Sequence, residues 1–163
     1  MPEGSVRRAQ LSDVPSMVDL SEQKRREYQA YQPQFWRKAP DSREKQLPFF
    51  ERLIESDQVI ALVHEHSGTI DGFVIASVVG APPVYDPGGK TCLIDDFVVA
   101  AAADWTTVGE ALLATANQEA KACGAVQTVV VCGHQDGPKR TMLAEGGFSI
   151  ASEWYVREIG DGG

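Results

Sequence analysis

The sequence predicts one α/β domain with a mixed β-sheet, and three observations lead to this expectation. The chain has 163 residues, of which 43% are hydrophobic, enough for a single core. Segments with strand-like and helix-like hydrophobic patterns follow one another in the order β-α-α-β-β-β-α-β-α-β(β). In the second half strands alternate with helices, as expected where neighbouring strands run parallel. We therefore expect one domain over residues 1–159 and a disordered tail over residues 160–163.

The N-terminal region predicts a short strand and a long helix. Residues 6–9 form the candidate strand. Ser12 is a candidate N-cap, and Pro15 suits the first turn of a helix that continues to Tyr31. The loop that follows, residues 32–41, contains two prolines and two aromatic side chains.

A second helix and a hairpin come next. Residues 42–54 carry apolar side chains at helical spacing, and Pro48 marks either a kink or a late start of this helix. Residues 59–65 and 70–79 are strand candidates. The turn-forming residues 66–69 between them predict a β-hairpin.

The second half of the chain predicts strands separated by helices. Residues 91–99 form a central strand, and residues 108–123 form the helix after it. Residues 126–132 are continuously apolar, which is expected of a strand covered on both faces. A short helix over residues 138–145 precedes a last strand or hairpin over residues 148–157.

Charge and composition exclude several classes of protein. The formal net charge of −8 argues against nucleic acid as the main partner, because phosphate binding requires a concentrated basic face. No apolar run approaches the roughly 20 residues that cross a bilayer, and the N-terminus lacks a secretory signal, so we expect a cytoplasmic protein without membrane contact. His64 and His66 lie two residues apart without a third ligand at metal-site spacing, so no metal is expected. An odd number of cysteines suits free, buried thiols: Cys92, Cys123 and Cys132.

Residues 93–113, LIDDFVVAAAADWTTVGEALL, are the most informative segment of the chain. They predict an apolar strand, a tight loop and a helix that begins at once. The first N–H groups of a helix have no intrahelical acceptor, and the positive end of the helix dipole lies there. A loop at this position therefore favours an anionic group.

This segment and the order of elements resemble the GCN5-related N-acetyltransferase family over nearly the whole chain. Residues 97–99 correspond to the family's L-x-V, residues 100–101 to its D-P, and residues 104–109 to its loop Q/R-x-x-G-x-G/A. Residues 140–148 resemble R-x-F-Y-E-K-L-G-F, and the pair Trp154–Tyr155 suits the final strands. The resemblance implies a sheet of six to seven strands that is splayed between the fourth and fifth strands. It also implies transfer of an acetyl group from acetyl-CoA to an amine.

The resemblance implies that acetyl-CoA, as the acyl donor, lies in this splay without a metal. Its contacts are expected from the fourth strand, the loop and the first turn of the next helix, with a cation supplied by the last helix. These residues are Phe97, Val98, Val99, Asp104, Trp105, Thr106, Thr107, Val108 and Gly109, with Lys139 or Arg140 as the cation.

Three residues depart from the family pattern. Asp104 stands where the family has Arg or Gln, and its carboxylate would repel a pyrophosphate by on the order of a few kcal/mol. Thr107 replaces the first glycine of the loop. Leu143 replaces a tyrosine that protonates the departing thiolate in many members. Tyr155, Tyr85 or a water molecule would have to supply that proton.

The pair Asp95–Asp96 is the main catalytic candidate. It lies in the run IDDFVV, which resembles L-E-D-F-F-V of the polyamine acetyltransferases, where the acidic pair lies beside the acceptor amine. An ammonium must lose a proton before it attacks, so a carboxylate within reach can act as general base, directly or through water. Strand alternation places Asp95 on the face of Phe97, which makes it the first choice. The alternative is that both carboxylates only cap loops or pair with Arg and Lys.

His134 is a second candidate base, because its imidazole titrates near neutral pH and it follows the strand at residues 126–132. The alternative is a histidine that is simply exposed in a loop. The aromatic residues between the first two helices fall where the family builds its acceptor pocket and could hold an apolar or cationic amine. They could equally fill the core beneath a loop or form a dimer surface. These residues are Tyr28, Tyr31, Phe35 and Trp36.

Two functions remain open at this point. The first is an N-acetyltransferase that acts on a small-molecule or peptide amine by direct attack on the thioester. The second is a catalytically degenerate protein of the same fold that binds a ligand or partner, which the three departures favour. The gapless spacing from Phe97 to Leu113 favours the enzyme. The resemblance also implies a homodimer.

Overall fold

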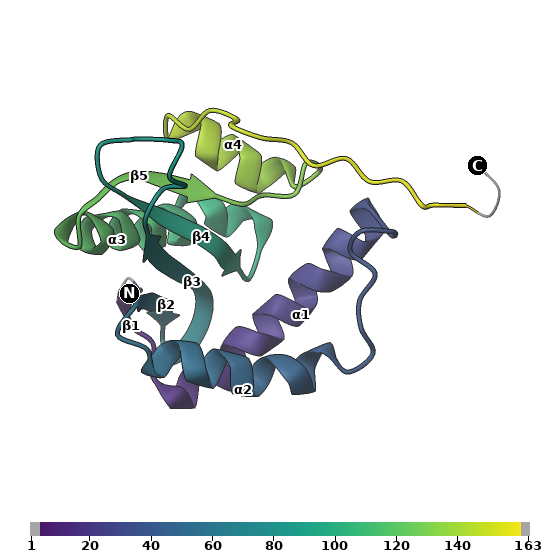
Figure 1. The fold of residues 1–163 in the computed structure, drawn as a ribbon. Helices are drawn as coiled ribbons and strands as arrows, with labels where there is room; N and C mark the ends of the chain where they lie inside the picture. The colour runs from purple at the N-terminus through teal and green to yellow at the C-terminus, as the bar shows by residue number, and fades with distance from the viewer. Residues whose placement is uncertain (1–3, 161–163) are drawn as a thin grey trace.

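The structure, a computed structural model, describes residues 4–160 of the chain. Its strands form one sheet whose spatial order equals the chain order, β1-β2-β3-β4-β5 (Figure 1). The first four strands are antiparallel, and β5 runs parallel to β4. This confirms a mixed α/β fold, with five strands among the described residues instead of the expected six to seven. The elements are β1 (Ser5–Arg8), η1 (Leu11–Asp13), α1 (Val14–Tyr31), α2 (Ser42–Glu55), β2 (Val59–His66), β3 (Thr69–Val79), β4 (Lys90–Val99), η2 (Ala102–Thr106), α3 (Val108–Ala122), β5 (Ala125–Val130) and α4 (Gly137–Glu145).

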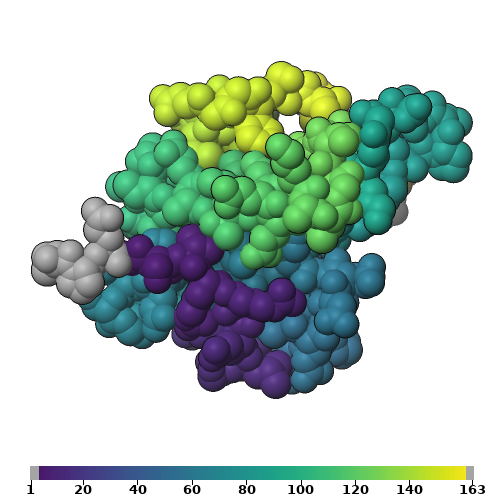
Figure 2. All heavy atoms as spheres, turned by 90° about the vertical axis from the view of Figure 1, so that its left-hand side faces the viewer, coloured from purple at the N-terminus to yellow at the C-terminus, as the bar shows by residue number. Residues whose placement is uncertain are grey.

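Helices cover both faces of the sheet and create two cores. On one face α1 and α2 pack over β2 and β3, where Phe50 and Phe73 meet edge to face at 5.7 Å. On the other face α3 and α4 pack over β4, where Phe97 and Trp105 meet at 4.9 Å. Figure 2 shows the layers from the side, with the N-terminal elements below the green α3 and β5 and the yellow C-terminal residues above them. No helix among the described residues combines the length and apolar character that a membrane crossing requires.

The predicted hairpin between β2 and β3 is confirmed. Ser67 and Gly68 form a two-residue turn, and both have a positive φ, of 52° and 79°. Two consecutive left-handed residues give the turn whose twist matches that of the paired strands. Glycine adopts this conformation without steric cost, which explains its place in the turn.

The helix α1 begins differently from the prediction, although Pro15 lies in its first turn as expected. Ser12 is not its N-cap, because the short helix η1 precedes α1 and Asp13 takes the cap position. The Asp13 carboxylate accepts a hydrogen bond of 2.8 Å from the backbone N–H of Gln10, which closes the turn of η1.

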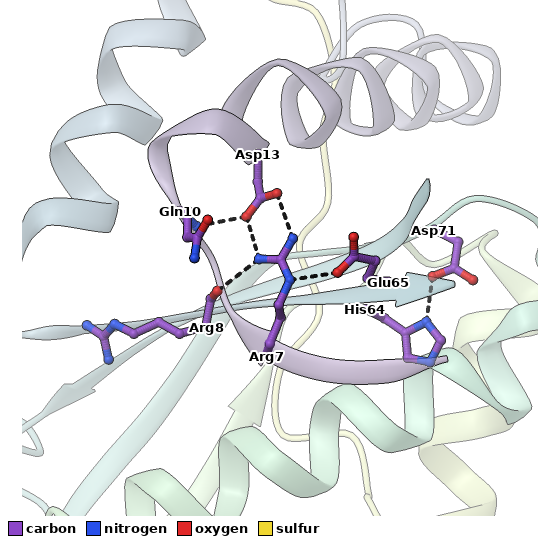
Figure 3. A network of polar contacts seen from close by, with 7 residues as sticks. All are labelled: Arg7, Arg8, Gln10, Asp13, His64, Glu65 and Asp71. Atoms are coloured by element: carbon purple, nitrogen blue, oxygen red, sulfur yellow. Dashed lines mark hydrogen bonds and ion pairs between the residues drawn. The ribbon is translucent and has the colours of Figure 1, made fainter. Parts of the chain in front are cut away.

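Arg7 links β1 to the start of α1 and to β2 (Figure 3). Its guanidinium donates two hydrogen bonds to Asp13, at 2.8 and 2.9 Å, and one to Glu65, at 2.9 Å. The hydrogen bonds from Arg7 lower the pKa of Asp13 below its usual value. Beside this network, His64 and Asp71 pair at 2.5 Å between Nδ1 and Oδ1.

The predicted splay between the fourth and fifth strands is present. The Cα pairing of β4 with β5 ends at Ile94 and Val130, and one more bond of 2.9 Å joins the Val131 N–H to the Ile94 carbonyl. The strand β4 continues to Val99, paired only with β3. The outer edge of β4 after Ile94 therefore lacks a neighbouring strand in the described part of the chain.

Two predictions about the C-terminal region are wrong. Residues 148–157 form no strand, and the segment runs extended from α4 away from the domain (Figure 1). The strand β5 is not covered on both faces, because Val129 is exposed, as is Val131 just after the strand. The outer edge of β5 also has no neighbouring strand among the described residues. The predicted disorder of residues 160–163 lies outside the described residues except for Gly160.

Candidate functional site

A β-bulge presents the two aspartates of β4 in different ways. Ala76 of β3 pairs with Ile94 and Ile75 pairs with Asp96, so Asp95 has no Cα partner. As a result Asp95 is exposed, whereas Phe97 and Val99 are buried. Simple strand alternation, which places Asp95 on the face of Phe97, fails here because the bulge interrupts the period of two.

Asp96 is the more buried of the two carboxylates and lies toward α1. Burial raises the pKa of Asp96, and the neighbouring Asp95 adds to this shift, while Lys24 and Arg25 of α1 oppose it. A carboxyl group whose pKa is raised toward neutral pH matches the requirement for a general base more closely than an ordinary surface carboxylate does.

Lys139, one of the two residues expected to supply a cation, lies in the splay with its ammonium directed at β4. Its side chain is 1% exposed, and its Nζ donates a hydrogen bond of 3.1 Å to the backbone carbonyl of Phe97. The ammonium also lies 5.3 Å from the Phe97 ring and 5.2 Å from the Trp105 ring. Burial lowers the pKa of Lys139 to about 8. A carbonyl on the open edge of β4 is thus occupied by the protein's own cation.

The loop between β4 and α3 folds back on itself as the short helix η2. The Asp104 carboxylate accepts a hydrogen bond of 3.2 Å from the Ala101 N–H. The hydroxyls of Thr106 and Thr107 donate to the carbonyls of Ala103 and Asp104, at 3.3 and 3.4 Å. The polar side chains expected to meet an anion are therefore engaged within the loop.

Gly109, the surviving glycine of the loop pattern, lies against the buried indole of Trp105. A Cβ at this position would meet the indole at 2.7 Å, closer than side chains approach in folded proteins. The glycine therefore has a packing role here that is independent of any ligand.

Tyr28 ties the C-terminal half of α1 to the segment after β5. Its hydroxyl donates to Asp136 at 2.6 Å and accepts a hydrogen bond of 3.2 Å from the Gly133 N–H. Burial and the neighbouring Asp136 raise the pKa of Tyr28 far above its usual value. Asp136 also accepts a bond from the Lys139 N–H, which makes it the N-cap of α4. These bonds hold α1 across the splay.

The structure brings the four predicted aromatic residues together. The ring of Tyr28 lies 5.5 Å from that of Tyr31 and 4.7 Å from that of Trp36, and Phe35 lies 5.2 Å from Trp36. Phe35 and Trp36 also line a hollow of about 390 Å³ between α1, the following loop and α2. Four cationic side chains and no carboxylate line this hollow within the described residues: Arg25, Arg37, Lys38 and Lys45.

Glu22 of α1 lies next to the hollow and joins the elements around it. Its carboxylate accepts hydrogen bonds from Ser42 and Arg25 and pairs with Lys38 at 3.0 Å. Burial alone would raise the pKa of Glu22, but these three partners outweigh it and lower the pKa to about 2. One buried carboxylate thus joins α1, the loop and the start of α2.

Replacing Glu22 with glutamine should cost roughly 1–3 kcal/mol of unfolding free energy at pH 7. Because the pKa of Glu22 is depressed in the folded state, its contribution is complete above the ordinary value of 4.5 and is lost as the pH falls toward about 2. Urea unfolding of wild type and Glu22→Gln across this range should show the difference shrinking. Glu51→Gln, on the exposed side of α2, is the control. A difference that stays constant with pH would contradict this role.

Several predicted site residues lie apart from Asp96 and Lys139. His134 is exposed, and its carbonyl accepts a bond of 2.9 Å from Arg140. Tyr155 is exposed in the C-terminal segment, where its hydroxyl donates to Glu153 at 2.9 Å. Tyr85 is exposed in the loop between β3 and β4. None of them contacts the splay in the described chain.

Sequence reasoning missed two features of the site. The first is the bond between Tyr28 and Asp136, which joins residues 108 positions apart and leaves no local signal. The second is the burial of Lys139. The pattern of α4 carried a signal for it, because Lys139, Met142 and Leu143 share one face at helical spacing, and all three are buried.

Comparison with known proteins gives no match to a protein-family model and none to a curated protein sequence. Solved structures do match. A single-site variant of a Bacillus halodurans protein has a TM-score of 0.83 at 14% identity, covering 94% of this chain and 98% of that one. A predicted acetyltransferase from Clostridium acetobutylicum, solved with acetyl-CoA, has a TM-score of 0.73 at 15% identity, covering 96% of each chain.

An aminoglycoside N-acetyltransferase in complex with a bisubstrate analogue, CoA-S-monomethyl-acetylneamine, also matches. Its TM-score is 0.73 at 13% identity, and the match covers 97% of this chain and 99% of that one. At such identities a likeness shows the fold and leaves the activity open. The parallel pair β4–β5 and its divergence after Ile94 agree with this likeness. The chain therefore has the fold of the GCN5-related N-acetyltransferases.

Proposed function

We propose that this protein is an N-acetyltransferase that moves an acetyl group from acetyl-CoA to a primary amine of a small molecule or peptide. The observation that carries the proposal is the half-buried carboxylate of Asp96 beside the open edge of β4. The fold, shared with acetyltransferases solved with CoA ligands, supports it. Its three cysteines are free, in keeping with a cytoplasmic enzyme, but the prediction that all three are buried is wrong, because Cys123 is exposed and Cys132 is half-buried.

The backbone of the splay suits the pantetheine arm of CoA, because the Phe97 carbonyl already accepts a hydrogen bond from a donor in the splay. Acetyl-CoA supplies the thioester acetyl group. Lys139 must withdraw from the Phe97 carbonyl before another donor can take its place. Around the loop, Trp105, Val108 and Gly109 shape the entrance, and the backbone N–H groups at the start of α3 favour an anion.

Within this proposal Asp96 is the base that removes a proton from the acceptor ammonium, and Asp95 contributes negative charge at the mouth of the site. Asp96 has the environment for this role, since burial raises its pKa. The amine then attacks directly, without a covalent intermediate on the protein. Lys24 of α1 opposes this rise in the pKa of Asp96.

The acceptor is expected in the hollow beside Trp36. Its four cationic side chains are balanced only in part, by Glu22 and by Asp41, which pairs with Lys45 at 3.2 Å. An amine that also carries a carboxylate or phosphate matches this hollow better than a polyamine, because a polyamine meets like charge.

A second candidate function is a catalytically degenerate protein that binds a ligand or partner. The occupied Phe97 carbonyl and the aliphatic Leu143 favour it. Isothermal titration with acetyl-CoA separates the two, with free CoA alongside. We expect micromolar binding of acetyl-CoA and tighter binding by Asp104→Arg, which removes a charge that repels pyrophosphate. Titrations that show no heat of binding up to millimolar acetyl-CoA would contradict the proposed enzymatic activity and favour the second candidate.

A further inference from the structure

Lys139 is the only buried lysine among residues 4–160. Within these residues its Nζ makes one hydrogen bond, to the Phe97 carbonyl at 3.1 Å, and no ion pair with a carboxylate. The rings of Phe97 and Trp105 lie beside it. Burying a charge without a counter-ion is costly, and loss of the proton relieves this cost. The surroundings of Lys139 therefore favour a neutral amine.

Charged groups around the splay shift the titration of Lys139 in both directions. Burial is the main cause that lowers its pKa to about 8, and Lys24 lowers the pKa further. Asp136 opposes the shift, but its carboxylate is engaged by the Tyr28 hydroxyl at 2.6 Å. About half of the molecules therefore carry a neutral Nζ at pH 8. The titratable groups that face Lys139 are Lys24 of α1, Asp95 and Asp96 of β4, and Cys132 and Asp136 after β5.

This amine lies where a ligand of the splay has to bind. The Phe97 carbonyl is on the part of β4 that extends beyond the pairing with β5, which ends at Ile94. A ligand donor that takes this carbonyl displaces the Nζ, which lies only 3.1 Å from the same oxygen. The displaced amine remains on the buried face of α4, so it stays next to the bound ligand.

We infer that Lys139 is a site of self-acetylation, at which the Nζ takes the acetyl group from acetyl-CoA bound in the splay. The inference rests on the proposed function, because it requires acetyl-CoA at this edge of β4. It adds a covalent modification of the protein itself. Because Lys139 is 1% exposed, an acetyl donor in bulk water reaches it poorly, and the bound ligand is the effective donor. Proximity in the bound complex replaces a bimolecular encounter.

The reaction balances without a further reactant. The neutral Nζ attacks the carbonyl carbon of the thioester, so that an N–C bond forms and the C–S bond breaks. The nitrogen gives up one proton, which goes to the departing thiolate directly or through water, and the products are acetyl-lysine and CoA. The new amide carries no charge, so acetylation removes the cost of burying an unpaired cation. An amide is a poor acyl donor, so the acetyl group stays on Lys139.

Mass spectrometry of peptides tests the site with the full chain and acetyl-CoA. We expect Lys139 to gain one acetyl group at least roughly 10-fold faster than Lys121, the matched control on the exposed side of α3. An excess of free CoA, which carries no acetyl group, should slow the acetylation of Lys139 and leave that of Lys121 unchanged. Equal rates at the two lysines, or a Lys139 rate that free CoA does not change, would overturn the inference.

The pH dependence of this acetylation is a second readout. Only the neutral amine reacts, so the rate at Lys139 should rise about 10-fold between pH 6 and pH 7 and level off above about pH 8. A rate that keeps rising about 10-fold per pH unit above pH 9 would contradict an amine whose pKa is lowered by burial.

Isothermal titration with acetyl-CoA at pH 6, where Lys139 is protonated and acetylation is slow, separates this inference from the proposed function. Micromolar binding together with an unmodified Lys139 at pH 8 would overturn self-acetylation and leave the proposed acetyltransferase intact. Absence of binding up to millimolar acetyl-CoA would overturn both. Binding together with selective acetylation of Lys139 is the expected result.

Discussion

Replacing Lys139 with alanine should strengthen acetyl-CoA binding by about 10- to 100-fold. A hydrogen bond from a charged donor is worth about 1.5–3 kcal/mol, and the wild type must break the bond from Lys139 to the Phe97 carbonyl before a ligand can use that carbonyl. The alanine variant removes this competitor and opens space between Phe97 and Trp105. Isothermal titration with acetyl-CoA measures the change.

Lys139→Met is the matched control for this result. Methionine also frees the Phe97 carbonyl, because it cannot donate a hydrogen bond, but it keeps most of the volume in the splay. The affinity of this variant should therefore lie between that of wild type and that of Lys139→Ala. Arg140→Ala controls for loss of a neighbouring positive charge on the exposed side of α4. Equal or weaker binding of acetyl-CoA by Lys139→Ala would show that Lys139 does not compete with the ligand for the Phe97 carbonyl.

Asp96→Asn should lower kcat by about 10²- to 10⁴-fold, the usual effect of losing a general base. The variant preserves the size of the side chain and leaves β4 intact, so KM for acetyl-CoA should change little. Asp95→Asn is the matched control, because it removes the same charge from the adjacent, exposed position. Its effect should be smaller, through the loss of attraction for an ammonium.

The pH profile distinguishes a base from a structural carboxylate. Burial raises the pKa of Asp96, so kcat/KM of wild type should fall as the pH drops through this raised pKa, where the base becomes protonated. Asp96→Asn should lack this acidic limb, and Asp95→Asn should keep it. Steady-state rates with an amine found by screening provide the measurement. An unchanged acidic limb in Asp96→Asn would assign the titration to another group.

Local patterns allowed much of the fold to be predicted. The hairpin at Ser67–Gly68, the order of helices and strands, and the divergence of β4 from β5 all depend on neighbouring residues or on a motif of fixed spacing. The N-cap of α1 was misplaced because Asp13 and Ser12 are equally good capping residues, and η1 decides between them.

The site was less accessible to sequence reasoning because its decisive features come from packing. The bulge opposite Ile75 and Ala76 gives Asp95 and Asp96 different environments. The residue types in β4 carry no sequence signal that predicts this bulge. The burial of Lys139 depends on the shape of the splay. The last strand was expected from its local pattern, but a strand also needs a paired neighbour, and residues 148–157 pair with no strand of the described chain.

The packing of Trp105 on Gly109 changes how this glycine is interpreted in evolution. Any larger side chain collides with the indole, so selection for a stable fold alone would retain the glycine. A lineage that had lost the use of CoA would keep Gly109 as faithfully as one that had not. The glycine therefore reports on Trp105, and evidence for CoA use has to come from other positions of the loop.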